Sequence, residues 1–223
     1  MKKISVLLIA ALCVALFASQ AQAQGVTIGL KTGMNLARVA LKVTEPVYPN
    51  EKNQTGLVQG IFVNFKLGPV TIQPELLYSR MGAKFVVYEG AEGTGTVHMR
   101  TDYLELPILV KYSFLSGAVK PFVIAGPSLS YLLNSKWGED YDNADPASTD
   151  YSYYYDYGEY YKKMEFAGVI AVGADYQLPK FVVSLELRYH LGLTNVASSE
   201  LTGDSAFTSI KNRAFSVLVG LGF

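Results

Sequence analysis

Residues 181–194 read FVVSLELRYHLGLT, and this stretch decides the fold. Its odd positions are apolar or aromatic throughout, whereas the even positions from Ser184 onward carry Ser, Glu, Arg, His, Gly and Thr. Successive side chains of a β-strand point to opposite faces, so the stretch predicts a strand with one apolar face and one charged face. The architecture then depends on which of the two faces is enclosed.

Seven further segments indicate β-strands, and most of them alternate in the same way, which predicts an all-β protein of eight strands. They lie near residues 26–37, 57–67, 70–79, 103–114, 121–133, 166–177 and 215–223. Segment 121–133 is apolar on both faces, so its two sides stay unassigned. The segments hold 9 to 14 residues each. An average soluble strand has about 5–6 residues, whereas a tilted strand needs about 9–11 to cross a bilayer.

The connections between these segments alternate in length. Long connections are expected at 39–56, 82–99, 134–163 and 195–210, and short ones at 67–69, 116–120 and 178–180. Outer-membrane barrels have short periplasmic turns and long extracellular loops. We therefore expect an all-β fold, an eight-stranded antiparallel up-and-down transmembrane β-barrel with both chain ends on the periplasmic side.

The charged face of the segments is predicted to line the barrel interior. It carries four basic and four acidic residues: Lys31, Lys66, Lys111, Arg188, Glu75, Glu105, Asp175 and Glu186. Side chains fill the interior of an eight-stranded barrel, and charges buried there must be paired. We expect the three glutamates to face inward and to contact Lys31, Lys111 or Arg188. The alternative of an acid–base catalytic group is open at this point.

The aromatic residues of the apolar face are predicted to sort by depth into two girdles, as at the two interfaces of a membrane. The short-turn girdle would hold Phe65, Tyr112, Phe114, Phe122, Tyr176, Phe181 and Phe223, and the long-loop girdle Tyr78 and Phe166. Lys211 and Arg213 fall on the apolar register of the last segment. Both lie at its loop end, where a lipid-facing cation costs only about 0–1 kcal/mol.

The first residues have the pattern of a secretory signal peptide, residues 1–23, which would leave 24–223 as the mature barrel domain. Two lysines precede an apolar run over 4–17, and Ala21 and Ala23 form a small-x-small cleavage pattern. The alternative is a retained membrane anchor, for which about 20 apolar residues would be needed.

The composition of the expected mature chain excludes several functional classes. The one cysteine, Cys13, lies within the signal, so disulfide and thiol chemistry are not expected. The full sequence has nineteen basic and nineteen acidic residues. Removal of the signal takes away two lysines and no acid, so the mature chain has seventeen basic residues and a formal charge of −2. This balance offers no electrostatic basis for binding nucleic acid.

Four segments resemble the PorT-like outer membrane β-barrel domain family of the Bacteroidetes. They are GLKTGMNLA at 29–37, QPELLYS at 73–79, YLELPILVKY at 103–112 and LELRYHLGLTN at 185–195. The resemblance covers residues 25–223 and implies the barrel fold and an outer-membrane location. Phe223 resembles the C-terminal signal that the barrel assembly machinery reads. The family is named after a protein with an accessory role in protein secretion, and these motifs do not imply that role for this chain.

The predicted loop 134–163 is rich in tyrosine and acid, with eight tyrosines and seven acids between Trp137 and Tyr161. Tyrosine clusters supply rigid amphipathic contact area, so the loop is a candidate binding surface for a protein or glycan ligand. The alternative is a solvated loop whose tyrosines lie against lipopolysaccharide. The aspartates at 140, 142, 145 and 150 suggest calcium, but their spacing lacks the Gly and Glu of a twelve-residue calcium loop.

The sequence fits three other functions less well. A lipid-modifying hydrolase would need a His near a Ser on the lipid-facing surface, whereas His190 falls on the inward register and His98 at a loop edge. A periplasmic lipocalin-like carrier would place its apolar face inside, and a porin needs about 16–18 strands. We therefore expect a structural or interaction protein acting through its extracellular loops, with no catalytic, cofactor-binding or metal-binding residues. The alternatives are a lipid-modifying membrane enzyme and a secretion-accessory barrel like the namesake of the family that the chain resembles.

Overall fold

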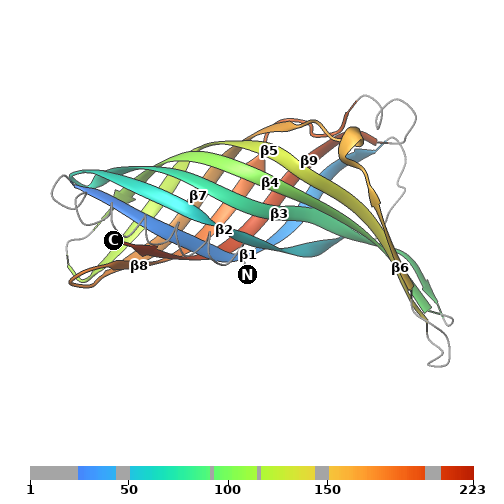
Figure 1. Ribbon diagram of the computed structural model, residues 1–223, viewed down its shortest axis with the longest axis horizontal. Helices are drawn as coiled ribbons and strands as arrows, with labels where there is room; N and C mark the ends of the chain where they lie inside the picture. The colour runs from blue at the N-terminus through green and yellow to red at the C-terminus, as the bar shows by residue number, and fades with distance from the viewer. Residues whose placement is uncertain (1–24, 44–50, 91–92, 115–116, 144–150, 199–206) are drawn as a thin grey trace, which may run out of the picture.

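The computed structural model describes residues 25–43, 51–90, 93–114, 117–143, 151–198 and 207–223. In these residues the chain forms nine β-strands and a short 3₁₀ helix, η2 (Figure 1). Their bounds are β1 Val26–Val43, β2 Glu51–Leu67, β3 Val70–Gly90, β4 Gly93–Ser113, β5 Val119–Asn143, β6 Tyr151–Asp156, η2 Gly158–Tyr160, β7 Met164–Gln177, β8 Val182–Gly192 and β9 Phe207–Gly222. The expected signal peptide, residues 1–23, lies outside the described residues.

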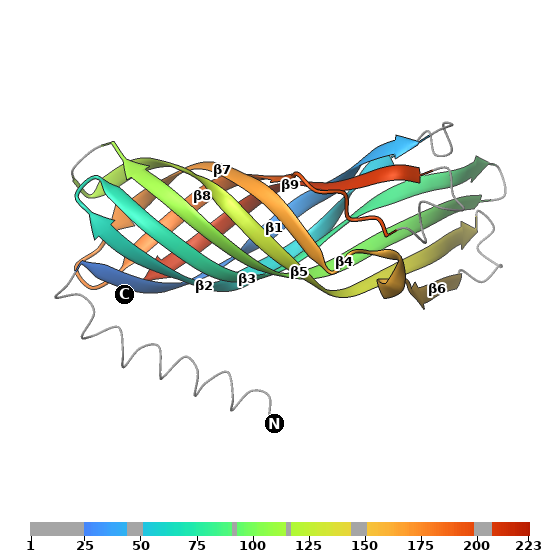
Figure 2. The ribbon, with the colours of Figure 1, turned by 90° about the horizontal axis from the view of Figure 1, so that it is seen from above.

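Eight of these strands close into a ring, which confirms the predicted antiparallel barrel (Figure 2). Each strand of the ring pairs with its neighbours along the chain, and β9 pairs with β1 to close it. The closure reaches the last residue, because Phe223 N–H donates to Ile28 O at 2.8 Å and Ile28 N–H donates to Phe223 O at 3.2 Å. Closure satisfies the backbone groups that an open sheet edge would leave unpaired in lipid. The ninth strand, β6, lies outside the ring and pairs with β5.

No helix in the described part of the chain is long and apolar enough to cross a membrane.

The two faces of the strands are sorted as predicted, with the apolar face outward. In β8, Leu185 and Leu187 are 53% and 54% exposed, whereas Glu186 and Arg188 beside them are 1% and 4% exposed. The unassigned segment is now resolved, since Phe122 and Ile124 of β5 point inward and Val123 points outward. An apolar exterior around a charged interior is the arrangement of a membrane barrel and the reverse of a lipocalin.

Two interior phenylalanines depart from the polar pattern of the inner face. Phe62 falls on the inward register of its segment, between the outward Ile61 and Val63, and Phe122 was predicted to join the outer short-turn girdle. That prediction for Phe122 was wrong, because both rings are buried inside the barrel. Glycines on neighbouring strands make room for them: a Cβ on Gly29 would overlap the Phe62 ring, and one on Gly173 would overlap Phe122. Glycine in a strand commonly marks such a close approach.

The half of the interior nearer the long loops holds an apolar cluster, which the sequence did not predict. Its buried cluster joins residues of five strands and two connections, namely Ala37, Val39, Met81, Ala83, Phe85, Met99, Tyr103, Leu132, Tyr161, Val196, Ala197, Ile210 and Ala214. Several of these residues fall in stretches expected to be loops. The barrel is therefore filled by ion pairs toward the short turns and by an apolar cluster toward the loops.

The strands are longer than predicted, and most of the expected long loops are strand. The predicted loop 82–99 is largely the β3–β4 hairpin, and 134–163 contains the end of β5, all of β6 and η2. The connections predicted to be short are short, since β2 ends at Leu67 before β3 at Val70, β4 at Ser113 before β5 at Val119, and β7 at Gln177 before β8 at Val182. A 25-residue strand such as β5 spans about 60 Å along a tilted barrel, roughly twice the hydrocarbon thickness. Figure 1 shows β3, β4, β5 and β6 continuing beyond the barrel as a curved extension. The ends of these strands were predicted too early because the extension does not face lipid, so its residues need not alternate between apolar and polar.

Candidate functional site

Four buried side chains form a closed ring of alternating charge inside the barrel. Lys31 Nζ lies 2.5 Å from Glu75 Oε1 and 2.8 Å from Glu186 Oε2. On the other side, Arg188 Nη1 lies 2.7 Å from Glu75 Oε2 and Nε lies 2.6 Å from Glu186 Oε1. The predicted inward register and partners of Glu75 and Glu186 are thus confirmed. Removing one partner from such a buried pair leaves an uncompensated charge, at a cost of about 3–5 kcal/mol.

Glu105 is buried as predicted, but its partner was predicted wrongly. Its Oε2 lies 3.6 Å from His190 Nδ1, and His190 Nε2 lies 3.9 Å from Glu165 Oε1. The guanidinium of Arg188 is already paired with Glu75 and Glu186, so Glu105 pairs with His190 instead. Glu165 was missed because its strand was expected to begin one residue later. Its Oε2 accepts a hydrogen bond of 2.8 Å from Asn212 Nδ2.

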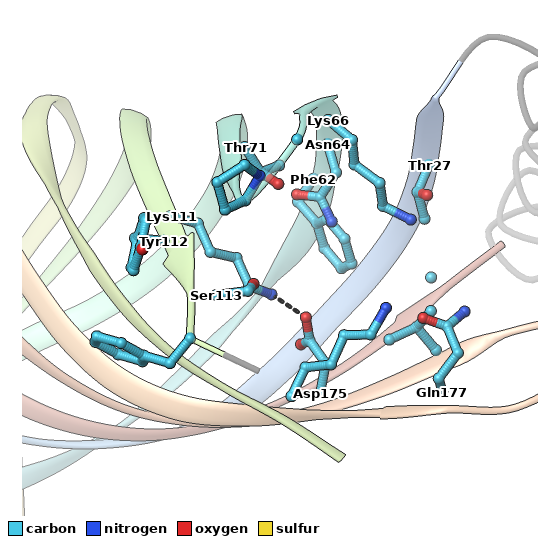
Figure 3. Close-up of a pocket in the computed structure, with 16 residues that line it drawn as sticks. Thr27, Phe62, Asn64, Lys66, Thr71, Lys111, Tyr112, Ser113, Asp175 and Gln177 are labelled. Carbon is cyan, nitrogen blue, oxygen red and sulfur yellow. Dashed lines mark ion pairs between the residues drawn. The ribbon is translucent and has the colours of Figure 1, made fainter. Parts of the chain in front are cut away.

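The short-turn end of the barrel opens into a polar cavity of about 380 Å³ (Figure 3). Lys111, on its inner side, pairs with Asp175 at 2.6 Å and lies over the Phe122 ring at 3.8 Å. Lys66 and Lys120 also line the cavity, so three cations face one carboxylate there. Lys66 was predicted to be interior, yet its side chain is exposed at this mouth. The cavity is a positively charged vestibule that lies below the ring of ion pairs.

The extension at the opposite end is anchored to the apolar cluster by one tryptophan. The Trp137 ring stacks on Tyr157 with centroids 5.2 Å apart, and its Nε1 donates to the Tyr161 hydroxyl at 3.0 Å. That hydroxyl in turn donates to Met99 Sδ at 2.7 Å. Burial raises the pKa of the Tyr161 phenol, so it remains a neutral donor. The base of the β5–β6 hairpin is therefore fixed to the barrel.

Beyond this anchor the tyrosines become exposed. Tyr153, Tyr154 and Tyr155 of β6 are 55%, 41% and 58% exposed, and Tyr160 of η2 is also exposed. Tyr154 is held by the Arg100 guanidinium, 5.1 Å from its ring centroid, and its hydroxyl donates to Asp140 Oδ1 at 3.2 Å. Tyr153 and Tyr155 project from one face of β6 and Tyr154 from the other. We call these three residues, together with Tyr160, the tyrosine platform.

His98 is not at a loop edge, as was predicted, but buried in β4. Its Nε2 lies 2.8 Å from Asp140 Oδ2 and its Nδ1 lies 3.2 Å from Gln54 Oε1. Asp140 was also a candidate calcium ligand, and its carboxylate is engaged by His98 and Tyr154. The structure describes no side chain for Asp142, and the stretch 144–150, with the remaining two candidate aspartates, lies outside the described residues. Within the described residues no group of three or more His, Cys, Asp or Glu side chains is arranged to hold a metal ion.

Comparison with known proteins identifies one family. Residues 18–198, more than half of the chain, match the sequence model described as the outer membrane protein beta-barrel domain. No curated protein sequence matches the chain.

Similar solved structures are small barrels with little sequence identity. Neisserial surface protein A is 12% identical with a TM-score of 0.43, and the match covers 89% of this chain and 96% of that one. The N-terminal β-barrel domain of Pseudomonas aeruginosa OprF is 13% identical, with a TM-score of 0.40 and coverages of 90% and 98%. Ail, the attachment invasion locus protein of Yersinia pestis, is 12% identical, with a TM-score of 0.41 and coverages of 89% and 99%.

Proposed function

Because the chain belongs to the outer membrane protein β-barrel domain family, we propose that this outer-membrane protein acts by binding a protein or glycan ligand through its tyrosine platform. The observation that carries the proposal is the exposure of Tyr153, Tyr154 and Tyr155 on a hairpin fixed at its base by Trp137. Tyrosine offers a large contact area and a polar tip while losing few rotamers on binding. A platform that is already ordered before binding loses little further entropy when a ligand arrives.

The rest of the barrel supports a binding role rather than transport or catalysis. The ring of Lys31, Glu75, Glu186 and Arg188 and the apolar cluster together fill the interior, so the walls carry the extension without enclosing an aqueous channel. We assign no catalytic role to the two histidines. His190 is enclosed between Glu105 and Glu165, away from the lipid-facing surface.

Binding is tested with a triple variant of the platform. Cells displaying the full-length protein are incubated with arrays of purified glycans and of extracellular proteins, and bound ligand is quantified. We expect the Tyr153→Ser, Tyr154→Ser, Tyr155→Ser variant to lose binding that the parent protein shows. Tyr112→Ser is the matched control, because Tyr112 is an equally exposed tyrosine at the short-turn end. Equal binding by the parent and the triple variant would contradict the proposal.

The enzyme alternative has its own test. Replacing His98 and His190 together by Asn should leave the mass spectrum of the cell's lipid A unchanged if the protein only binds. A changed lipid A spectrum in this variant, with the barrel still folded, would favour the lipid-modifying enzyme.

We also propose a PorT-like position within the family and export by the signal at residues 1–23. The first is supported by the segments at 73–79, 103–112 and 185–195, and the second by the cleavage pattern at Ala21 and Ala23.

The aromatic ring of Phe223 supports recognition by the barrel assembly machinery. If so, Phe223→Ala should reduce the amount of folded barrel in the outer membrane.

A further inference from the structure

Two arginines lie directly opposite each other on the outer face of the barrel. Arg38 of β1 and Arg213 of β9 are Cα partners in the strand pairing that closes the ring. Lys211 follows on the same face of β9, opposite Ala40. The next outward residues toward the short turns are Leu36 and Phe215, and both are exposed. The three cations therefore sit at the upper boundary of the apolar belt.

This arrangement is unfavourable unless an anion joins it. Like charges directly opposite in a sheet destabilise the pairing. Elsewhere on the outer face the chain supplies the counter-charge itself, since Arg80 Nε lies 2.7 Å from Asp102 Oδ1. None of Arg38, Lys211 and Arg213 forms an ion pair with a side chain in the described part of the chain. Arg213 Nη1 donates to Gly192 O at 2.8 Å, which holds its guanidinium in place.

The height of the cluster matches a lipid headgroup. Phe65 of the short-turn girdle is the Cα partner of Val26 and marks the lower interface. Arg38 lies twelve residues further along β1 than Val26. With a rise of about 3.3 Å per residue and a tilt of about 40°, this corresponds to about 30 Å along the barrel axis. The apolar band of such barrels is about 25 Å tall, so the cluster lies just above it.

An apolar groove runs from the cluster down the barrel wall. Arg38 and Arg213 line a depression of about 230 Å³ together with Leu36, Tyr189 and Phe215. The same three apolar residues also line a larger groove of about 780 Å³ that continues past Val217. The Tyr189 and Phe215 rings lie 4.6 Å apart at the junction of the two. A cationic end joined to an apolar groove is complementary to one kind of molecule, an acyl chain with an anionic head.

We propose that Arg38, Lys211 and Arg213 bind a phosphate group of an acylated glycolipid of the outer leaflet, the chemistry of lipopolysaccharide, with an acyl chain in the adjoining groove. Guanidinium groups bind phosphate oxygens through paired, charge-assisted hydrogen bonds, and phosphate between the two arginines removes their mutual repulsion. The site is separate from the tyrosine platform, so either proposal can fail without the other.

The test uses the full barrel refolded in detergent and purified lipid A as the probe. Binding is measured by native mass spectrometry with bisphosphorylated lipid A, with the same lipid after removal of its phosphates, and with inorganic phosphate as competitor. The variant is Arg38→Gln, Arg213→Gln. The matched control is Arg80→Gln, which removes an outer-face arginine that already has a carboxylate partner.

We expect the double variant to bind bisphosphorylated lipid A about tenfold or more weakly than the parent, and Arg80→Gln to bind like the parent. The parent should bind dephosphorylated lipid A only weakly, with an affinity similar to that of the double variant for bisphosphorylated lipid A. Each of three results would overturn the proposal. The first is that the double variant binds bisphosphorylated lipid A as tightly as the parent. The second is that the parent binds the phosphorylated and dephosphorylated lipids equally well. The third is that inorganic phosphate at the same concentration as the lipid displaces it fully, which would indicate a site for free anions. Unchanged heat-modified mobility in electrophoresis verifies that the double variant folds.

Discussion

Arg188 and Glu75 lie 113 residues apart in the sequence, yet Arg188 Nη1 on β8 lies 2.7 Å from Glu75 Oε2 on β3. The pair crosses the barrel interior and, with Lys31 and Glu186, connects three strands that are not all adjacent in the sheet. Hydrogen bonds between neighbouring strands fix the barrel wall, whereas this contact fixes the distance across it. The interior ring therefore acts as a cross-brace between opposite sides of the barrel.

Glu75→Gln should destabilise the barrel strongly. The substitution keeps the size of the side chain but leaves the charges of Lys31 and Arg188 without one of their two buried carboxylates. We expect a loss of about 3–5 kcal/mol, measured by urea unfolding of the refolded protein. Glu159→Gln in η2 is the control, because Glu159 is exposed and should change stability by less than about 0.5 kcal/mol. Similar losses for both variants would show that the interior ring has no special role.

Gly29→Ala should destabilise the barrel through contact with Phe62. A Cβ at this position would overlap both the Phe62 ring and the backbone carbonyl oxygen of Leu221, and overpacking of this kind costs about 1–3 kcal/mol. Phe62→Leu alone leaves a cavity, but combined with Gly29→Ala it removes the overlap of the new methyl group with the ring, while the overlap with the Leu221 carbonyl remains. The two substitutions should therefore couple favourably in a double-mutant cycle of unfolding free energies. Strict additivity would contradict direct packing of Gly29 against the ring.

Trp137→Ala should loosen the extension and leave the barrel intact. The substitution removes the stack on Tyr157 and the hydrogen bond to the Tyr161 hydroxyl, worth roughly 0.5–1.5 kcal/mol for each kind of contact. We expect faster proteolysis within residues 137–163, measured by mass spectrometry of the fragments, with an unchanged unfolding midpoint of the barrel. Tyr131→Ala, which removes a ring from the outer face of the same strand, should not change cleavage of the extension. Equal cleavage rates in the parent and Trp137→Ala would show that the anchor lies elsewhere.

The parts of the fold that could be predicted are those where lipid and interior impose opposite chemistry on adjacent residues. Leu185, Glu186, Leu187 and Arg188 alternate because each outward position meets acyl chains and each inward position meets another strand. That pattern predicted the inward register of Glu75 and Glu186, and Lys31 and Arg188 were two of the three partners predicted for them.

Where that opposition is absent, the predictions failed for an identifiable reason. Phe122 belongs to a strand that is apolar on both faces, because Gly173 opens space for its ring inside the barrel. The ends of β3, β4 and β5 lie beyond the membrane, where neither face needs to be uniformly apolar. The pairing of Glu105 with His190 depends on which neighbours are already engaged across the interior, and a one-dimensional pattern does not contain this information.

The first residues should be removed by signal peptidase. Signal peptidase accepts small side chains at the first and third positions before the bond that it cuts, and Ala23 and Ala21 supply them. We expect the protein isolated from outer membranes to begin at or near Gln24, which N-terminal sequencing and intact mass will establish. Ala23→Arg places a long charged side chain next to the cleavage site, so it should yield the longer precursor, held at the inner membrane by its apolar run. Leu8→Ile is the control within that run and should be processed normally. Outer-membrane protein that retains residues 1–23 would contradict the prediction.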